Sequence, residues 1–141
     1  RLDKDSSGLI LLTNDGDIVN RILRAEFGHE REYMVTLDRP YSPTFLRCME
    51  QGVLVQGEKT RPCRTARVGV LTFRIMLTEG RNRQIRRMCS ALGYRVVRLV
   101  RVRIMHIRLG DLEVGKWREL TPREQEKLIA AVGLSEEKAA S

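Results

Sequence analysis

The stretch GRNRQIRRMCSALGYRVVRLVRVRI, residues 80–104, contributes most to predicting the fold. Apolar side chains recur at i, i+3, i+4 and i+7 over residues 85–92, which is the spacing of a helix with one buried face. Glycine rarely continues a helix, so we expect this helix to run from about Arg83 to Leu92 and to end at Gly93. Its arginines would then project from the opposite, polar face.

The second half of the stretch changes its period. Residues 94–109 are rich in β-branched side chains, which predicts extended structure. The alternation of apolar and polar residues slips near Leu99 and Val100 and again near Met105. A slip of one residue exchanges the two faces of a strand, so we expect either two strand pieces or a bulge.

Shorter signals on both sides complete the pattern. Ser42 followed by Pro43 is typical of a helix N-terminus, and Thr121-Pro122-Arg123-Glu124 has the form of a capping box. Strands outnumber helices, so we expect one α+β domain over residues 1–133, with a mostly antiparallel sheet flanked by helices, and a disordered tail over residues 134–141. The other expected elements are strands over residues 8–13, 31–37, 72–78 and 117–120, a hairpin over residues 53–62, a helix capped by Asp17, and helices over residues 43–51 and 122–132.

Positive charge is concentrated in one region. The formal net charge is +8, from 26 Lys and Arg against 18 Asp and Glu, yet residues 80–110 hold nine arginines and no lysine or acid. Ordinary protein surfaces mix the two signs, so this segment favours binding of phosphates and stacking on bases over a merely solvated face. The nine are Arg81, Arg83, Arg86, Arg87, Arg95, Arg98, Arg101, Arg103 and Arg108.

Other features of the composition exclude several classes of protein. The three cysteines, Cys48, Cys63 and Cys89, never form a C-x-x-C pair, which argues against a disulfide framework and against a zinc site. No apolar run approaches the ~20 residues of a membrane-spanning helix, and no signal-peptide pattern opens the chain. We therefore expect a cytoplasmic protein without a bound metal.

Two polar features are candidates for function. RLDKDSSG, residues 1–8, is a loop in which Asp3 or Asp5 either bonds its own backbone as a turn residue or supplies a functional carboxylate. Tyr33 enters an expected strand as either a core residue or a platform on which a base could stack. The residues alone leave both questions open. Trp117, the one tryptophan, is expected to be a structural anchor.

Together these pieces resemble the pseudouridine synthases of the small-subunit rRNA type, the RsuA type. The resemblance covers nearly the whole chain, and residues 22–33, ILRAEFGHEREY, are most similar to its RluF-like branch, which modifies 23S rRNA of the large subunit in bacteria. The motifs that carry it are RLDKDSSGLILLTNDGD (residues 1–17), similar to the catalytic loop, REY (31–33), similar to the tyrosine-bearing strand, GRNRQIRRMCSALGYRVVRLVRVRI (80–104), similar to the second signature, and GDLEVGKWRELTPRE (110–124), similar to the C-terminal end.

The resemblance implies roles for individual residues. Asp3 would be the catalytic aspartate, Arg86 would be its ion-pair partner, and Tyr33 would lie against the target uracil and help to remove the C5 proton. Arg1 would contact the RNA or fill the space left by an extruded nucleotide, while Arg83 and Gln84 would shape the same site. The expected RNA-binding residues, taken with the arginine-rich segment, are Arg1, Arg83, Gln84, Arg87, Arg101 and Arg103.

The implied reaction is the isomerisation of a uridine to pseudouridine in rRNA, expected in a structured stem-loop of 23S rRNA, by a monomer without metal or cofactor. Members of the family usually carry an S4-type RNA-binding domain and a K-P-x-G segment upstream, so we expect this chain to be a fragment of such a protein. Two other classes remain open. One is a non-catalytic module for rRNA binding or ribosome assembly; the other is a DNA-binding regulator, against which the lack of a helix-turn-helix pattern counts.

Overall fold

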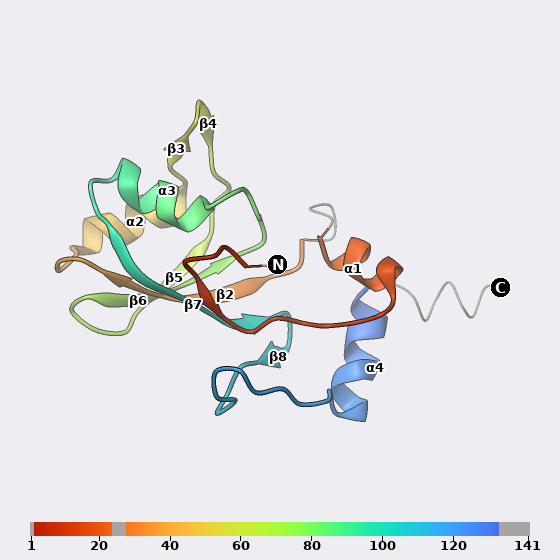
Figure 1. Ribbon diagram of the computed structural model, residues 1–141. Coiled ribbons are helices and arrows are strands. Elements are labelled where there is room, and N and C mark those ends of the chain that lie inside the picture. Colours follow the sequence, from red (N-terminus) through yellow and green to blue (C-terminus); the bar gives the residue numbers. More distant parts are fainter. Residues whose placement is uncertain (1, 24–27, 133–141) are drawn as a thin grey trace.

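The computed structural model describes residues 2–23 and 28–132, and their main element is a six-stranded sheet (Figure 1). Its central strands pair antiparallel, in the order β7 (Val96–Ile104), β2 (Arg31–Leu37) and β6 (Thr72–Leu77). β5 (Arg64–Arg67) extends the sheet beyond β6, and β8 (Ile107–Arg108) pairs with β7. β1 (Ser7–Gly8) runs parallel to β7, so the sheet is mixed rather than purely antiparallel. The expected α+β fold is confirmed.

The helices α2 (Pro43–Gln51) and α3 (Gln84–Ala91) lie on the same face of this sheet (Figure 1). The Ser42 hydroxyl accepts a hydrogen bond of 3.2 Å from the Phe45 amide, which caps α2 as the sequence predicts. The helix ends before Gly52. The φ of 103° at this residue is allowed for glycine but strained for other residues. The apolar sides of both helices pack against alternate residues of β2 and β6 and enclose the main core.

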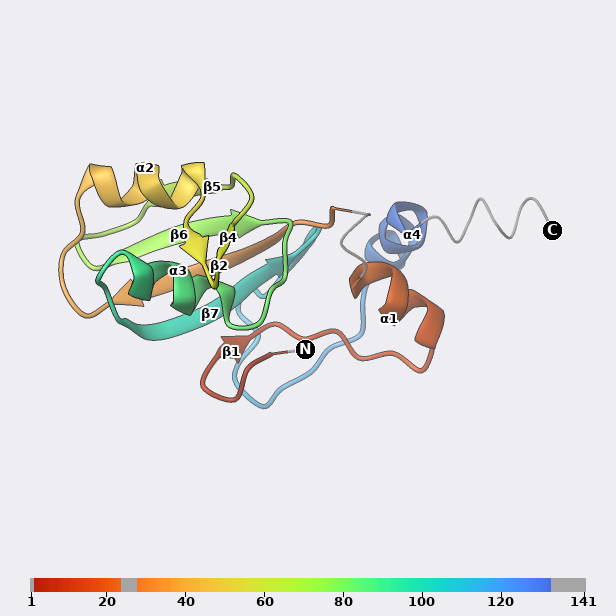
Figure 2. The same ribbon diagram turned by 90° about the horizontal axis from the view of Figure 1, so that it is seen from above.

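The helices α1 (Gly16–Leu23) and α4 (Pro122–Ala131) lie side by side at one end of the sheet, away from α2 and α3 (Figure 2). The Arg21 guanidinium donates a hydrogen bond of 2.9 Å to the Val132 carbonyl, which joins the two helices. Leu128 of α4 belongs to a second apolar cluster with Leu9, Ile104 and Ile107. The capping box predicted at Thr121 and Glu124 is present and begins α4.

Two β-bulges interrupt β7 opposite β2. Arg103 pairs with Glu32 while Arg101 pairs with Tyr33, so Val102 is the extra residue of the first bulge; Val97 is the extra residue of the second. The expected interruption is thus confirmed, although both bulges lie away from the predicted slips. Because of the first bulge, Arg101 and Arg103 reach opposite faces of the sheet despite their spacing of two.

Several local predictions were wrong. The strand expected over residues 8–13 ends at Gly8; the Leu9 amide still donates to the Arg101 carbonyl at 2.8 Å, but Ile10 and Leu12 are exposed. Asp15, not Asp17, caps α1 by accepting a hydrogen bond from the Asp17 amide at 3.0 Å. Residues 117–120 form no strand, because no strand of the described sheet lies beside them to pair with.

The structure also adds β5, which the sequence pattern did not predict, and resolves residues 53–62 into β3 (Leu54–Val55) and β4 (Glu58–Lys59), a hairpin as expected. Arg1 and the tail predicted over residues 134–141 lie outside the described residues. No helix among residues 2–23 and 28–132 has the length and apolar character needed to cross a membrane.

Candidate active site

The loop that carries Asp3 is a tight turn leading directly into the sheet. The Ser6 amide donates a hydrogen bond of 3.0 Å to the Asp3 carbonyl, which closes a turn over residues 3–6. β1 follows at once and places Gly8 opposite Arg101 of β7. A Cβ atom on Gly8 would lie 2.2 Å from the Arg101 carbonyl oxygen, so only glycine allows the chain to approach β7 this closely. The turn is therefore anchored at its C-terminal side by the sheet.

The N-terminus of α3 holds the same turn from the other side. The Arg83 guanidinium binds the Asp5 carboxylate through two hydrogen bonds, of 2.7 Å to Oδ1 and 2.8 Å to Oδ2. This parallel geometry is the strongest form of an arginine–carboxylate pair. Arg83 also has a left-handed backbone, with a φ of 50°, in the residue just before α3. Such a conformation is uncommon for a residue other than glycine.

Arg86, one turn along α3, contacts the loop as well. Its Nη2 donates a hydrogen bond of 2.8 Å to the Asp5 carbonyl, and its Nε lies 3.5 Å from Oδ2 of Asp5. The side chain is only 15% exposed, so its position is fixed by the packing around it. The ion pair predicted between Arg86 and Asp3 is not among the described contacts, and Asp5 occupies that place. The role of Arg86 as the partner of Asp3 stays a prediction.

The charges of this cluster support one another. The Arg83 hydrogen bonds lower the pKa of Asp5 from its ordinary 3.8 to about 2, and the nearby Arg86 charge acts in the same direction. Hydrogen bonding to Asp5 in turn raises the pKa of Arg83, to which the charge of Asp3 also contributes. Asp3 is therefore close enough to Arg83 for their charges to interact, and the loop carries two acids beside two arginines.

Tyr33 lies on the sheet two strands away from this loop. The strand registers place Ile75, Tyr33, Arg101 and Gly8 in one row across β6, β2, β7 and β1. Tyr33 is half-buried and packs against the main core, which fits the core interpretation of its ring. Tyr33 packs against the core to which α3 contributes, and the Asp3 loop contacts the N-terminal part of α3, although contact between Tyr33 and the loop is not among the described interactions.

The residues expected to bind RNA occupy different environments. Arg87 lies on α3 and bonds the carbonyl and side chain of Asn82. Gln84 is 4% exposed and its amide bonds Glu79 and Arg81 within the protein. Arg101 is 4% exposed and donates from Nε to the Leu9 carbonyl at 2.8 Å. Contact of any of these side chains with RNA stays a prediction.

Arg103 is committed to ion pairs on the face opposite Tyr33. Its Nε donates to Glu32 at 2.9 Å and its Nη2 donates to Glu30, while Arg74 and Arg64 bind the same two acids. Burial opposes ionisation of Glu32, but hydrogen bonds from Arg103 prevail and lower the pKa of Glu32. This network holds β2, β5, β6 and β7 together, so a contact of Arg103 with RNA would have to compete with it.

Asp5 is the residue of the Asp3 loop to which the sequence analysis assigned no role in the site. Its signal was the pair of acids at positions i and i+2, in a chain whose arginine-rich segment contains no acid of its own. Within residues 2–23 and 28–132, no group of three or more His, Cys, Asp or Glu side chains could hold a metal ion. The described contacts of the Asp3 turn with α3 join the Asp5 carboxylate and carbonyl to two guanidinium groups.

Comparison with known proteins defines the class. The family model for RNA pseudouridylate synthase matches residues 1–91, a span that includes the Asp3 turn, Tyr33 and all of α3. The chain belongs to this family. A solved structure described as a crystal structure of pseudouridylate synthase superimposes with a TM-score of 0.86 at 38% identity, covering 90% of this chain and 56% of that one.

Within the family, the chain is similar to more than one named pseudouridine synthase. It is 52% identical over 124 residues to the dual-specificity RNA pseudouridine synthase RluF of Escherichia coli, covering 88% of this chain and 43% of that protein. It is 39% identical over 132 residues to the ribosomal small subunit pseudouridine synthase A of Haemophilus influenzae, covering 92% of this chain and 57% of the relative. The chain thus spans about half the length of the curated relatives it matches.

Proposed function

We propose that this chain is part of an rRNA pseudouridine synthase and that it isomerises a uridine with Asp3 as the catalytic residue. The observation that carries the proposal is the Asp3 turn, held between β7 and the N-terminus of α3, in a chain 52% identical to RluF. A catalytic carboxylate needs such support on rigid elements, because a small displacement from the reacting atoms lowers the rate strongly.

The reaction breaks the N1–C1′ bond of uridine, turns the uracil, joins C5 to C1′ and releases the proton from C5. An ionised aspartate can either attack as a nucleophile or remove a sugar proton as a base. Tyr33 would contact the extruded uracil and help to remove the C5 proton.

The substrate would be a structured stem-loop of 23S rRNA, acted on by a monomer in the cytoplasm. A uridine inside a stem or loop must leave its stack before a side chain can reach C1′, so the enzyme must extrude it. The arginines of residues 80–110 would hold the RNA backbone while this happens. Arg86 would help to orient the Asp3 loop, and Arg1, Arg83, Gln84, Arg87, Arg101 and Arg103 would contribute to RNA recognition.

Release of tritium from [5-³H]uridine in large-subunit rRNA tests the proposal. Formation of the C5–C1′ bond must expel that tritium, and Asp3→Asn should stop the release while changing RNA affinity less than about threefold, because it removes one charge and little volume. Release that persists in Asp3→Asn would contradict the role of Asp3, and no release by the wild-type protein would favour a non-catalytic RNA-binding module.

A further inference from the structure

The loop that carries Asp3 is fixed by one side chain that neither the family match nor the relatives assign. Asp5 receives both hydrogen bonds of the Arg83 guanidinium, and its own carbonyl receives one from Arg86. Among the described contacts, Asp3 contributes a backbone carbonyl within its own turn. The carboxylate that couples the loop to the helix is therefore that of Asp5.

The turn transmits this restraint to Asp3. Asp3 and Ser6 are the ends of the turn, and Asp5 lies within it. Holding the side chain and carbonyl of Asp5 at α3 leaves the two residues before it little freedom, since Gly8 is already fixed against β7. With Asp5 bound to the arginines, the carboxylate of Asp3 can face a substrate.

The geometry of Arg83 indicates that the contact is specifically built. A non-glycine residue in a left-handed conformation is strained and persists where other interactions hold it. Arg83 has this conformation at the start of α3, and its guanidinium binds both oxygens of the Asp5 carboxylate. The charge of Asp5 also lies between Arg83 and Arg86, which keeps the two cations together beside the loop.

We propose that Asp5 is a positioning residue, which clamps the Asp3 turn onto Arg83 and Arg86 so that Asp3 is held ready for reaction. This inference rests on the proposed function, because it gives Asp5 its role through Asp3. Asp5 itself touches no reacting atom. Removing the Asp5 carboxylate should leave the fold and RNA binding in place while the turn becomes mobile.

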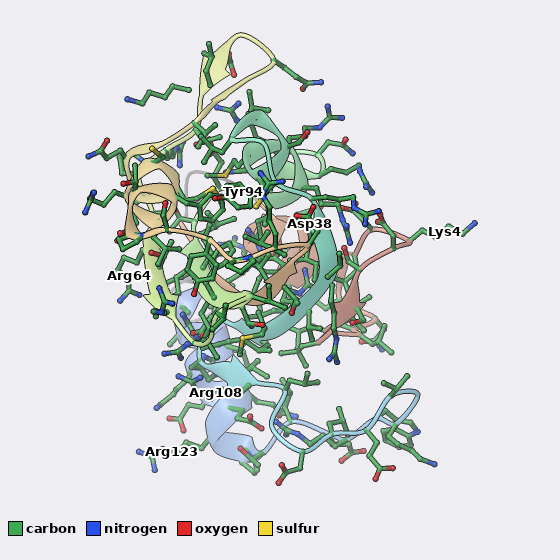
Figure 3. All side chains as sticks on the ribbon, turned by 90° about the vertical axis from the view of Figure 1, so that its left-hand side faces the viewer. Lys4, Asp38, Arg64, Tyr94, Arg108 and Arg123 are labelled. Atoms are coloured by element: carbon green, nitrogen blue, oxygen red, sulfur yellow. The ribbon has the colours of Figure 1, made fainter. Side chains whose placement is uncertain are left out.

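The order of the turn can be measured without any activity. Lys4 extends from the loop into solvent (Figure 3), so a lysine-specific protease can cut the Lys4–Asp5 bond once the turn opens. Arg83→Gln breaks the clamp without changing the cleaved sequence and should speed cleavage about tenfold, if the clamp contributes about 1.4 kcal/mol to turn closure. Cleavage of Arg83→Gln at the wild-type rate would overturn the proposal.

Arg118→Gln is a matched control for this experiment. Arg118 binds Glu124 through two hydrogen bonds of 2.7 and 2.9 Å, and its side chain is 39% exposed, as is that of Arg83. The pair lies at the start of α4, outside the loop and α3. Its loss should leave cleavage at Lys4 unchanged; equal acceleration in both variants would mean general loosening and would also overturn the proposal.

Single-turnover kinetics at saturating RNA test the role in positioning. Asp5→Ala should slow the chemical step on the order of 100-fold with little change in thermal midpoint or RNA affinity, and Asp5→Glu should recover part of the rate. The double variant Asp5→Ala with Arg83→Gln should be no slower than Asp5→Ala, because both changes remove the same contact. A rate for Asp5→Ala within about twofold of wild type, or a loss explained by weaker RNA binding, would refute the assignment.

The two proposals fail separately. If the wild-type enzyme releases tritium and Asp5→Ala does so equally fast, the positioning role is wrong and the proposed function stands. If no wild-type protein releases tritium, the proposed function fails, and the protease experiment still decides whether Asp5 clamps the turn.

Discussion

At the scale of single residues, Gly8 shows how closely the Asp3 loop meets the sheet. Its φ of 116° and the 2.2 Å separation between a built Cβ and the Arg101 carbonyl oxygen both exclude a larger side chain. A Cβ there would push β1 away from β7 and carry the turn with it. Packing and backbone conformation thus reinforce each other at this position.

Gly8→Ala should lower the free energy of unfolding by about 3 kcal/mol, the range of strained backbone combined with overpacking. Urea denaturation gives this quantity. Gly16→Ala is the control. Gly16 is the first residue of α1, and a Cβ atom built there would meet nothing within 4 Å. Equal stability of Gly8→Ala and wild type would show that β1 separates from β7 without cost.

At the scale of elements, the β2 strand is tied to its neighbours by buried charge as well as by backbone hydrogen bonds. The Glu32 side chain is 5% exposed and binds Arg103 of β7 at 2.9 Å and Arg74 of β6 at 3.2 Å. Breaking a buried pair by removing one partner costs more than the pair itself contributes, since the other charge is left uncompensated. The acid should therefore dominate how the sheet responds to pH.

Glu32→Gln should lower the free energy of unfolding at pH 7 by about 3 kcal/mol. The pKa of Glu32 lies below its ordinary 4.5 in the folded protein, so its contribution is full above that value and is lost as the pH falls through the folded pKa. The difference between wild type and variant should consequently shrink below pH 4.5, as measured by denaturation at several pH values. If the free energies of unfolding of wild type and Glu32→Gln ran parallel across pH, this prediction would be contradicted. Glu126→Gln, on the exposed side of α4, serves as the control.

The elements that the sequence predicted well have local signals. Ser42 and Pro43 at one end and Gly52 at the other define α2, because capping and termination depend on neighbouring residues alone. β5 was missed because Arg64–Arg67 lacks the alternation of apolar and polar residues that predicts a strand. This segment is a strand only through its pairing with β6. Residues 117–120 were expected to form a strand but have no such partner in the described sheet, so the prediction failed there for the opposite reason.

The residues proposed for the site came from the resemblance, whereas their contacts could not be predicted from the sequence. The resemblance pointed to Asp3, Tyr33 and Arg86, and the structure places Asp3 and Arg86 at one junction of loop and helix. Which of two aspartates faces the arginines depends on the turn between them and on the left-handed backbone of Arg83. Neither is encoded in spacing, since both arise when the loop docks on α3.

At the scale of the whole molecule, the charge distribution predicts how binding responds to salt. Removing a side chain that neutralises one phosphate lowers the slope of log affinity against log salt by about 0.7 to 0.9. Arg87→Gln together with Arg98→Gln, both in the arginine-rich segment, should lower the slope for RNA by up to about 2. Titrations at several salt concentrations measure it.

The control is Arg118→Gln together with Arg123→Gln, which removes the same amount of charge near α4. Arg123 lies far from Lys4 of the Asp3 loop (Figure 3). This double variant should keep the wild-type slope. An equal reduction in the two double variants would mean that net charge, rather than a defined RNA-binding face, governs affinity.

β5 has a consequence for how copies of this protein meet one another. It forms one edge of the sheet, and its first and last residues, Arg64 and Arg67, are both exposed. Unpaired strand edges invite other chains to add to them and start aggregates. Two such edges would bring their arginines together, and the resulting repulsion favours molecules that stay dispersed at high concentration.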